Sequence, residues 1–137
     1  MSANIQPIFC RQAKVEFAKL LTANTTRDGA SGTIYYIFAS DAANGGRVNK
    51  IVLQPLGSNV ATVVRIFYNS GGLNTAPANN ALIREILMPA TTSTEAAILL
   101  ATEVILDIVL PPNGKLFAVV GTGIAAGIMA SAQGGDY

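Results

Sequence analysis

Turn-forming residues recur along the whole chain and divide it into short segments, which is the strongest constraint on its fold. Clusters rich in Gly, Asn, Asp, Pro, Ser and Thr stand at 25–32, 41–46, 57–59, 69–80, 89–94, 111–114 and 121–127. The segments between them are rich in Ile, Val, Phe, Tyr and Thr, and they cover 14–21, 33–39, 48–53, 60–68, 82–88, 102–110, 115–120 and 127–132. Short strands punctuated this often are typical of an all-β sandwich or barrel. We therefore predict one domain of about eight strands.

Two of the segments also fit a helical period, so their side-chain alternation has to decide. From Lys14 to Ala18, apolar and polar residues alternate, and we interpret 11–21 as a strand. The segment 95–106 has good helix formers, and a short helix or an irregular turn before the strand at 102–110 stays open. In that strand Glu103, Ile105, Asp107 and Val109 share one face, which is half polar.

The absence of certain residue types excludes several kinds of chemistry. The 137 residues contain no His and a single cysteine, Cys10. His-based catalytic triads, mixed Cys/His metal sites and a disulfide within the chain are therefore excluded. Glu103 and Asp107 would stand about 13 Å apart on a strand, farther apart than a glycosidase pair requires. We predict a non-enzymatic protein with no cofactor and no metal site, and keep a hydrolase that works from Glu103 as an alternative.

The glycine-rich segment near the C-terminus matches two motifs, and both interpretations fail on length or composition. The segment 121–126 fits the dinucleotide fingerprint, but the chain after Gly127 is too short for the helix, second strand and acidic residue that this site needs. The uncharged stretch 116–135 contains five glycines, unlike a membrane-spanning helix. We interpret 121–127 as a glycine-rich hairpin between the last two strands, and predict no membrane segment.

The low charge of the chain predicts that part of its surface is covered. Charged residues make up 12% of the sequence and the formal net charge is +1, compared with about 25% charged residues in typical soluble domains. Basic residues are scattered singly, so we predict no nucleic-acid partner. Neutral surfaces tend to associate, and we expect another protein to cover part of this one. Tyr35, Tyr36 and Tyr68 fit a core or a subunit interface, with stacking on a sugar as the alternative.

The N-terminal segment is the first candidate for a contact with a neighbour. We divide the chain into an arm, 1–13, and a domain, 14–137. The arm carries Ile5, Pro7, Ile8 and Phe9, and Pro7 favours an extended form. We expect this arm to lie along a neighbouring subunit or a shell. The loops 69–80, with Leu73, and 89–94 are further candidates. Residues 1–9 lack a basic start, so we expect synthesis in the cytoplasm without a secretion signal.

Several segments, taken in order, carry a resemblance to a known family. They are NIQPIF (4–9), LTANTTRDGASGT (21–33), ANGGRVNKI (43–51), NVATVVRIFYNSG (59–71), PATTSTEAA (89–97) and GTGIAAGIMASAQGGDY (121–137). Together they resemble small tailed-phage virion proteins that are similar to jelly-roll capsid decoration, or cement, proteins.

The resemblance implies a jelly-roll-like antiparallel β-sandwich that binds the outer surface of the phage head as a homotrimer and stabilises the shell. Its partners would be other copies of itself and the major capsid protein or another virion protein. The resemblance brings no catalytic residues. The alternative is a tail, baseplate or head-fibre component with a receptor- or glycan-binding role.

Overall fold

A computed structural model describes residues 10–137 of the chain. The strands in this range are β1 (Gln12–Leu20), β2 (Tyr35–Ala39), β3 (Gly46–Pro55), β4 (Thr62–Asn69), β5 (Asn80–Met88), β6 (Thr102–Leu110), β7 (Lys115–Val120) and β8 (Ile128–Asp136). One 3-10 turn, η1 (Pro77–Asn79), precedes β5. All eight predicted strands are present, and β1 begins two residues before the predicted domain start. The segment 89–101 is an irregular loop, which was one of the two predictions left open.

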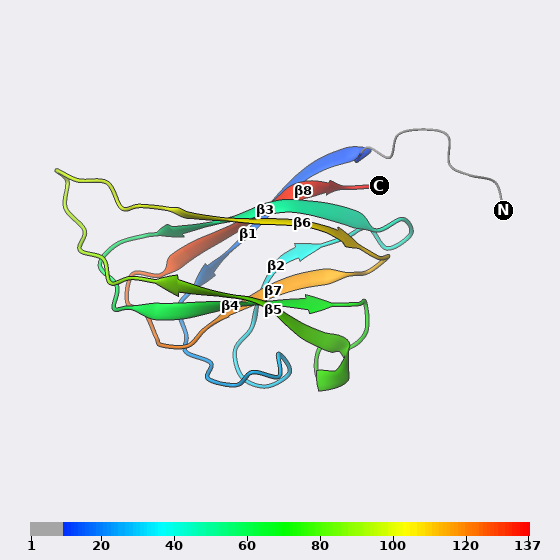
Figure 1. The fold of residues 1–137 in the computed structure, drawn as a ribbon, viewed down its shortest axis with the longest axis horizontal. Coiled ribbons are helices and arrows are strands. Elements are labelled where there is room, and N and C mark those ends of the chain that lie inside the picture. The colour runs from blue at the N-terminus through cyan, green and yellow to red at the C-terminus, as the bar shows by residue number, and fades with distance from the viewer. Residues whose placement is uncertain (1–9) are drawn as a thin grey trace.

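The strands form two four-stranded antiparallel sheets that pack face to face (Figure 1). Sheet A has the order β1-β8-β3-β6, and sheet B has the order β2-β7-β4-β5. In this part of the chain only β4 and β5 are consecutive strands of one sheet, and every other connection crosses to the opposite sheet. Two sheets joined by such crossings form a jelly roll. The predicted all-β, jelly-roll-like sandwich is confirmed.

The connection between β7 and β8 corrects one prediction. We expected the segment 121–127 to be a hairpin, but β7 lies in sheet B and β8 in sheet A, so the segment crosses between the sheets. Asn59 holds the crossing: its Oδ1 accepts hydrogen bonds from the amides of Ala126 (3.0 Å) and Gly127 (3.1 Å), and its Nδ2 donates to the Gly127 carbonyl (2.9 Å). Glycines mark the reversal, but they do not determine which strand becomes the neighbour.

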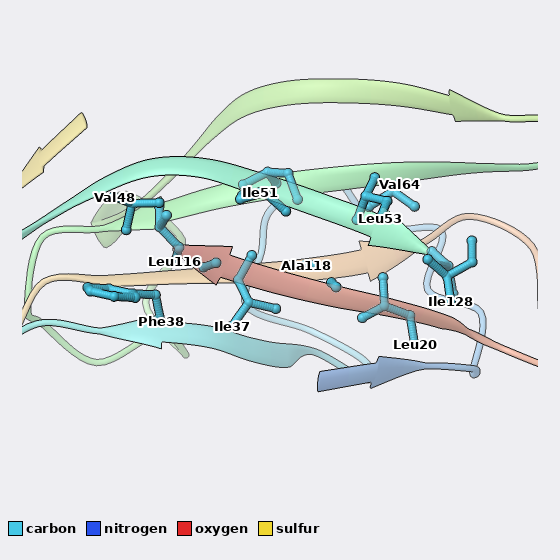
Figure 2. Packing of buried hydrophobic residues seen from close by; sticks show 14 of the residues in the cluster. Leu20, Ile37, Phe38, Val48, Ile51, Leu53, Val64, Leu116, Ala118 and Ile128 are labelled. Atoms are coloured by element: carbon cyan, nitrogen blue, oxygen red, sulfur yellow. The ribbon is translucent and has the colours of Figure 1, made fainter. Parts of the chain in front are cut away.

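The core lies between the two sheets and is built by the inward-facing half of each strand. Figure 2 shows Ile51, Leu53 and Ile128 from sheet A packed with Ile37 and Leu116 from sheet B. Each of these residues exposes at most 1% of its surface to solvent. Burying a side chain of this size contributes about 1.5–3 kcal/mol, so the alternation of apolar residues explains why the two sheets pack together.

A second, smaller cluster lies on the outer face of sheet B. Phe67, Phe117 and Val119 point away from the core and are nevertheless buried, with Ile34 packed beside them. The rings of Phe67 and Phe117 stack with centroids 5.3 Å apart. The segment 21–34, which joins β1 to β2, covers them, and we call it the cover segment.

The cover segment is fixed in place by glycine geometry and by side-chain hydrogen bonds. Gly29 has φ +68°, and a Cβ there would stand 2.9 Å from the Phe67 ring, so only glycine fits without strain. Asn24 Nδ2 donates to the carbonyls of Ser31 (2.8 Å) and Thr33 (2.9 Å). The chain therefore supplies its own cover for the part of the outer face of sheet B that carries Phe67 and Phe117.

Candidate functional site

The outer face of sheet A is exposed. Along β1, Val15 and Phe17 point outward, and Phe17 keeps 67% of its surface accessible. Along β6, Ile105 and Val109 point outward and are also exposed. We call the outward side of sheet A the open face. Its apolar side chains lie along both margins, because β1 and β6 are the two edge strands of the sheet.

Polar side chains occupy the middle of the open face. The strand register places Val15, Gln133, Lys50 and Ile105 in one row across the sheet, and Phe17, Ser131, Val52 and Glu103 in the next. Lys50 Nζ lies 3.1 Å from Glu103 Oε1, and Arg47 Nη2 lies 3.3 Å from Asp107 Oδ1. Since these charges pair across β3 and β6, the open face is nearly neutral. A partner does not need a strong opposite charge to bind it.

A long loop carries a second set of exposed apolar side chains. The residues 89–101, which we call the distal loop, join β5 to β6 and project from one end of the sandwich (Figure 1). Ile98 is 83% exposed and Leu100 is 74% exposed. The strand-and-turn pattern predicted a contact loop only at 89–94. The segment 96–101 could have indicated that the loop extends to 101, because every residue in it is apolar and a half-buried strand would alternate apolar and polar residues.

Hydrogen bonds hold the base of the distal loop to the rest of the domain. Thr91 and Asn59 exchange two backbone hydrogen bonds of 2.9 and 3.1 Å. Thr91 Oγ1 donates to the Gly57 carbonyl at 2.7 Å, and Gln54 Nε2 donates to the Leu99 carbonyl at 3.0 Å. Between the two halves of the loop lies a hollow of about 420 Å³, with Pro55 and Met88 at its base. No charged residue lines this hollow.

The predicted contact residue Leu73 is exposed on a loop that side-chain hydrogen bonds hold together. It is 76% exposed, and its carbonyl accepts a hydrogen bond from Asn79 Nδ2 at 2.9 Å. Asn80 Nδ2 donates to the Asn74 carbonyl at 2.7 Å. The other predicted contact residues, Ile5, Pro7, Ile8 and Phe9, lie outside the residues that the structure describes. The structure does not bring Leu73 together with the open face or the distal loop into one site.

Apart from Glu95 in the distal loop, the acidic side chains of residues 10–137 have structural partners, and they do not converge on a pocket. No group of three or more Cys, Asp and Glu side chains in this range is placed to hold a metal ion. Lys14 Nζ lies 3.2 Å from Glu16 Oε1 and 3.3 Å from Asp136 Oδ2. Burial opposes the charge of Lys14, but these two carboxylates outweigh it and raise its pKa. This cluster ties the end of β8 to β1.

Asp28 and Asp41 accept hydrogen bonds from backbone amides of their own loops. The backbone amides of Ala30 and Ser31 donate to Asp28 and lower its pKa. The amides of Asn44 and Ala43 do the same for the pKa of Asp41.

Glu85 has two arginine partners. The hydrogen bond from Arg65 Nε, at 2.9 Å, lowers the pKa of Glu85, and Arg27 of the cover segment adds to this effect. Glu103, the residue that the hydrolase alternative requires, is paired with Lys50 on an open sheet and not in a cleft.

Of the three tyrosines singled out in the sequence, two pack against the core and one is exposed. Tyr35 and Tyr68 pack against the main core, and the Tyr35 hydroxyl accepts hydrogen bonds from the amides of Thr22 (2.9 Å) and Leu21 (3.3 Å). Tyr36 is exposed and donates to Asn74 Oδ1 at 2.8 Å.

Comparisons with models of protein families, with curated proteins and with solved structures found no match for this chain. Within residues 10–137, no helix has the length and the apolar composition needed to cross a lipid bilayer.

Proposed function

We propose that this protein is a non-enzymatic structural component of a tailed-phage virion. In this proposal it binds the outer surface of the head as a decoration, or cement, protein and stabilises the shell through contacts between subunits. The observation that carries the proposal is the set of exposed apolar side chains on the open face and the distal loop. Exposed apolar side chains that are grouped on one face and one loop, and that no other part of residues 10–137 covers, are typical of protein–protein contacts.

The free energy gained by burying these side chains favours many weak contacts acting together over one strong contact. Each 1,000 Å² of apolar surface removed from water contributes up to about 25 kcal/mol before the costs of association. The margins of the open face expose only a few side chains, so one contact of this kind is weak. Copies tiled on a shell act together, because each added contact of a tethered subunit is effectively intramolecular.

The fold supports the same role. A decoration protein has to transmit load between its contacts without deforming. The Lys14 cluster ties β1 to the end of β8, and Asn59 and Thr91 hold the base of the distal loop. The resemblance to jelly-roll decoration proteins supports the phage head as the partner.

Purified virions test the proposal. Quantitative mass spectrometry of purified heads is expected to find hundreds of copies of the chain per particle. Particles that lack it are expected to release their DNA at a lower temperature than complete particles. Absence of the protein from purified heads would overturn the proposal.

One observation favours the alternative role in a tail or fibre. Tyr36 presents an exposed ring beside the loop that carries Leu73, and Lys115 Nζ lies 5.7 Å from the centre of this ring. An exposed aromatic ring next to amide and ammonium groups can stack on a sugar. A copy number in the low tens per particle, together with glycan binding that Tyr36→Ala abolishes, would favour this alternative.

A further inference from the structure

The last part of the distal loop, residues 98–101, leaves apolar side chains exposed and most of its backbone unpaired within the described part of the chain. Residues 98–101 lead directly into the edge strand β6, yet they belong to no strand pair. Within residues 10–137, the backbone of 98–101 makes one hydrogen bond, in which the Leu99 carbonyl accepts from the Gln54 side chain. An apolar extended segment at a free sheet edge is suited to pairing with an added strand.

The hollow beside this segment is suited to a neutral, apolar occupant. It measures about 420 Å³ and no charged side chain lines it. The N-terminal segment of this chain has the matching composition, because residues 1–9 contain no charged side chain and include Ile5, Ile8 and Phe9. A buried charge without a partner would be costly in such a contact, and this segment brings no charged side chain.

Residues Ile5–Phe9 of the same copy cannot reach this hollow. The amide of Arg11 bonds to the carbonyl of Asp136, at one end of β8. Pro55, at the base of the hollow, pairs with Ile128 at the other end of β8. Eight residue steps of a strand span about 26 Å, and Figure 1 shows the distal loop at the end of the molecule away from the C-terminus. Ile5 lies five residues before Cys10 and reaches at most about 18 Å from it.

We propose that the hollow of the distal loop receives residues Ile5–Phe9 from a second copy of this chain. This inference rests on the proposed role as a self-associating structural protein and names its contact. The added segment pairs with the free backbone of 98–101, and its apolar side chains cover Ile98 and Leu100. The contact joins one end of a copy to the opposite end of the next, so it is head-to-tail. Such contacts close into rings when the rotation between copies permits.

Site-directed cross-linking between two different copies tests the inference. The unmodified full-length chain has one thiol, Cys10, next to the proposed inserting segment. A second version carries Cys10→Ser and Ala90→Cys, which moves the thiol to the lining of the hollow. The two versions are mixed at high concentration, treated with a short bis-maleimide, and analysed by mass spectrometry. The matched control replaces Ala90→Cys by Ala81→Cys, at the far exposed end of β5.

The expected result is a covalent dimer whose linked peptides join position 10 of one version to position 90 of the other, and its loss when position 81 carries the thiol. Phe9→Ser is expected to weaken self-association by about tenfold or more. If the chain assembles with no 10–90 link and Phe9→Ser changes nothing, the inference is overturned and the decoration role stands. A 10–90 link in a protein that is absent from purified heads would keep the inference and overturn the decoration role.

Discussion

The two outer faces of this sandwich begin from the same pattern and end in different states. Both sheets alternate apolar residues on both sides, and both place phenylalanine outward: Phe67 and Phe117 on sheet B, and Phe17 on sheet A. On sheet B the cover segment buries these rings. On sheet A no described segment does so, and Phe17 is 67% exposed. An outward-facing phenylalanine on a strand therefore indicates that another segment covers it. Whether that segment belongs to the same chain depends on how the loops of the fold are placed.

The two faces are expected to respond differently to substitution, because burial determines what a side chain contributes to folding. A side chain that is already covered in the single chain contributes to the free energy of unfolding. A side chain that stays exposed contributes only when a partner covers it. Stability measurements on the free protein should therefore separate the faces, and association measurements should reverse their order.

The largest difference is expected for the two phenylalanines. Phe117→Ala removes a fully buried ring and its stacking contact with Phe67, and it is expected to lower the free energy of unfolding by about 3–5 kcal/mol. Phe17→Ala is expected to change it by less than about 0.5 kcal/mol. Urea denaturation of both variants at low protein concentration measures the two values. Equal losses would show that the open face is already covered within a single chain.

A smaller effect is expected from the glycine that lets the cover segment lie on sheet B. Gly29→Ala places a Cβ 2.9 Å from the Phe67 ring at φ +68°, and is expected to cost about 1–3 kcal/mol. Gly123→Ala is the matched control, since its Cβ would meet no atom closer than 3.8 Å. Urea denaturation compares the two. If both substitutions cost the same, the close fit of the cover segment is not what makes glycine necessary at position 29.

Much of the fold follows from the sequence, because turn residues and alternation act locally. The eight strands were predictable, including β1, whose period also suited a helix. The neighbours of each strand were not, as the segment 121–127 illustrates. Its glycines predicted a reversal, but the crossing to the other sheet depends on distant contacts with Asn59. A local signal cannot contain a contact that is 68 residues away.

The candidate site was predictable only in parts. The alternation at 102–110 placed Ile105 and Val109 on a half-polar face, and the alternation at 14–18 placed Val15 and Phe17 together. That both pairs belong to one open face depends on sheet A having β1 and β6 as its edges. The cover segment was predicted as a turn region only, because nothing local in 25–32 indicates that it packs on Phe67 and Phe117.

Association is expected to show the opposite order from stability. We expect the open face to add a second contact between copies, beside that of the distal loop. Phe17→Ser removes the largest exposed side chain of this face and is expected to weaken self-association by about tenfold, with little change in the free energy of unfolding. Analytical ultracentrifugation over a range of concentrations measures this. Leu73→Ser, on the loop between β4 and η1, is the comparison variant. A loss with Leu73→Ser and none with Phe17→Ser would show that the second contact lies at that loop and not on the open face.

The smallest effect is expected from acid, and it should act on the covered face. Asp28 lies in the cover segment, and Glu85 is bound by Arg27 of that segment and by Arg65 beneath it. Both carboxyl groups have pKa values lowered by folding, from reference values of 3.8 and 4.5. A carboxyl group whose pKa is lower in the folded state stabilises the fold above its unfolded pKa, and this contribution disappears as the pH falls through the folded value. The urea midpoint is therefore expected to be constant from pH 7 to about pH 5 and to fall below about pH 4.

Glu85→Gln should flatten this dependence of the urea midpoint on pH, whereas Glu95→Gln, in the exposed distal loop, should leave it unchanged. A dependence that Glu95→Gln flattens equally would show that acid acts on the molecule as a whole and not on the cover of sheet B.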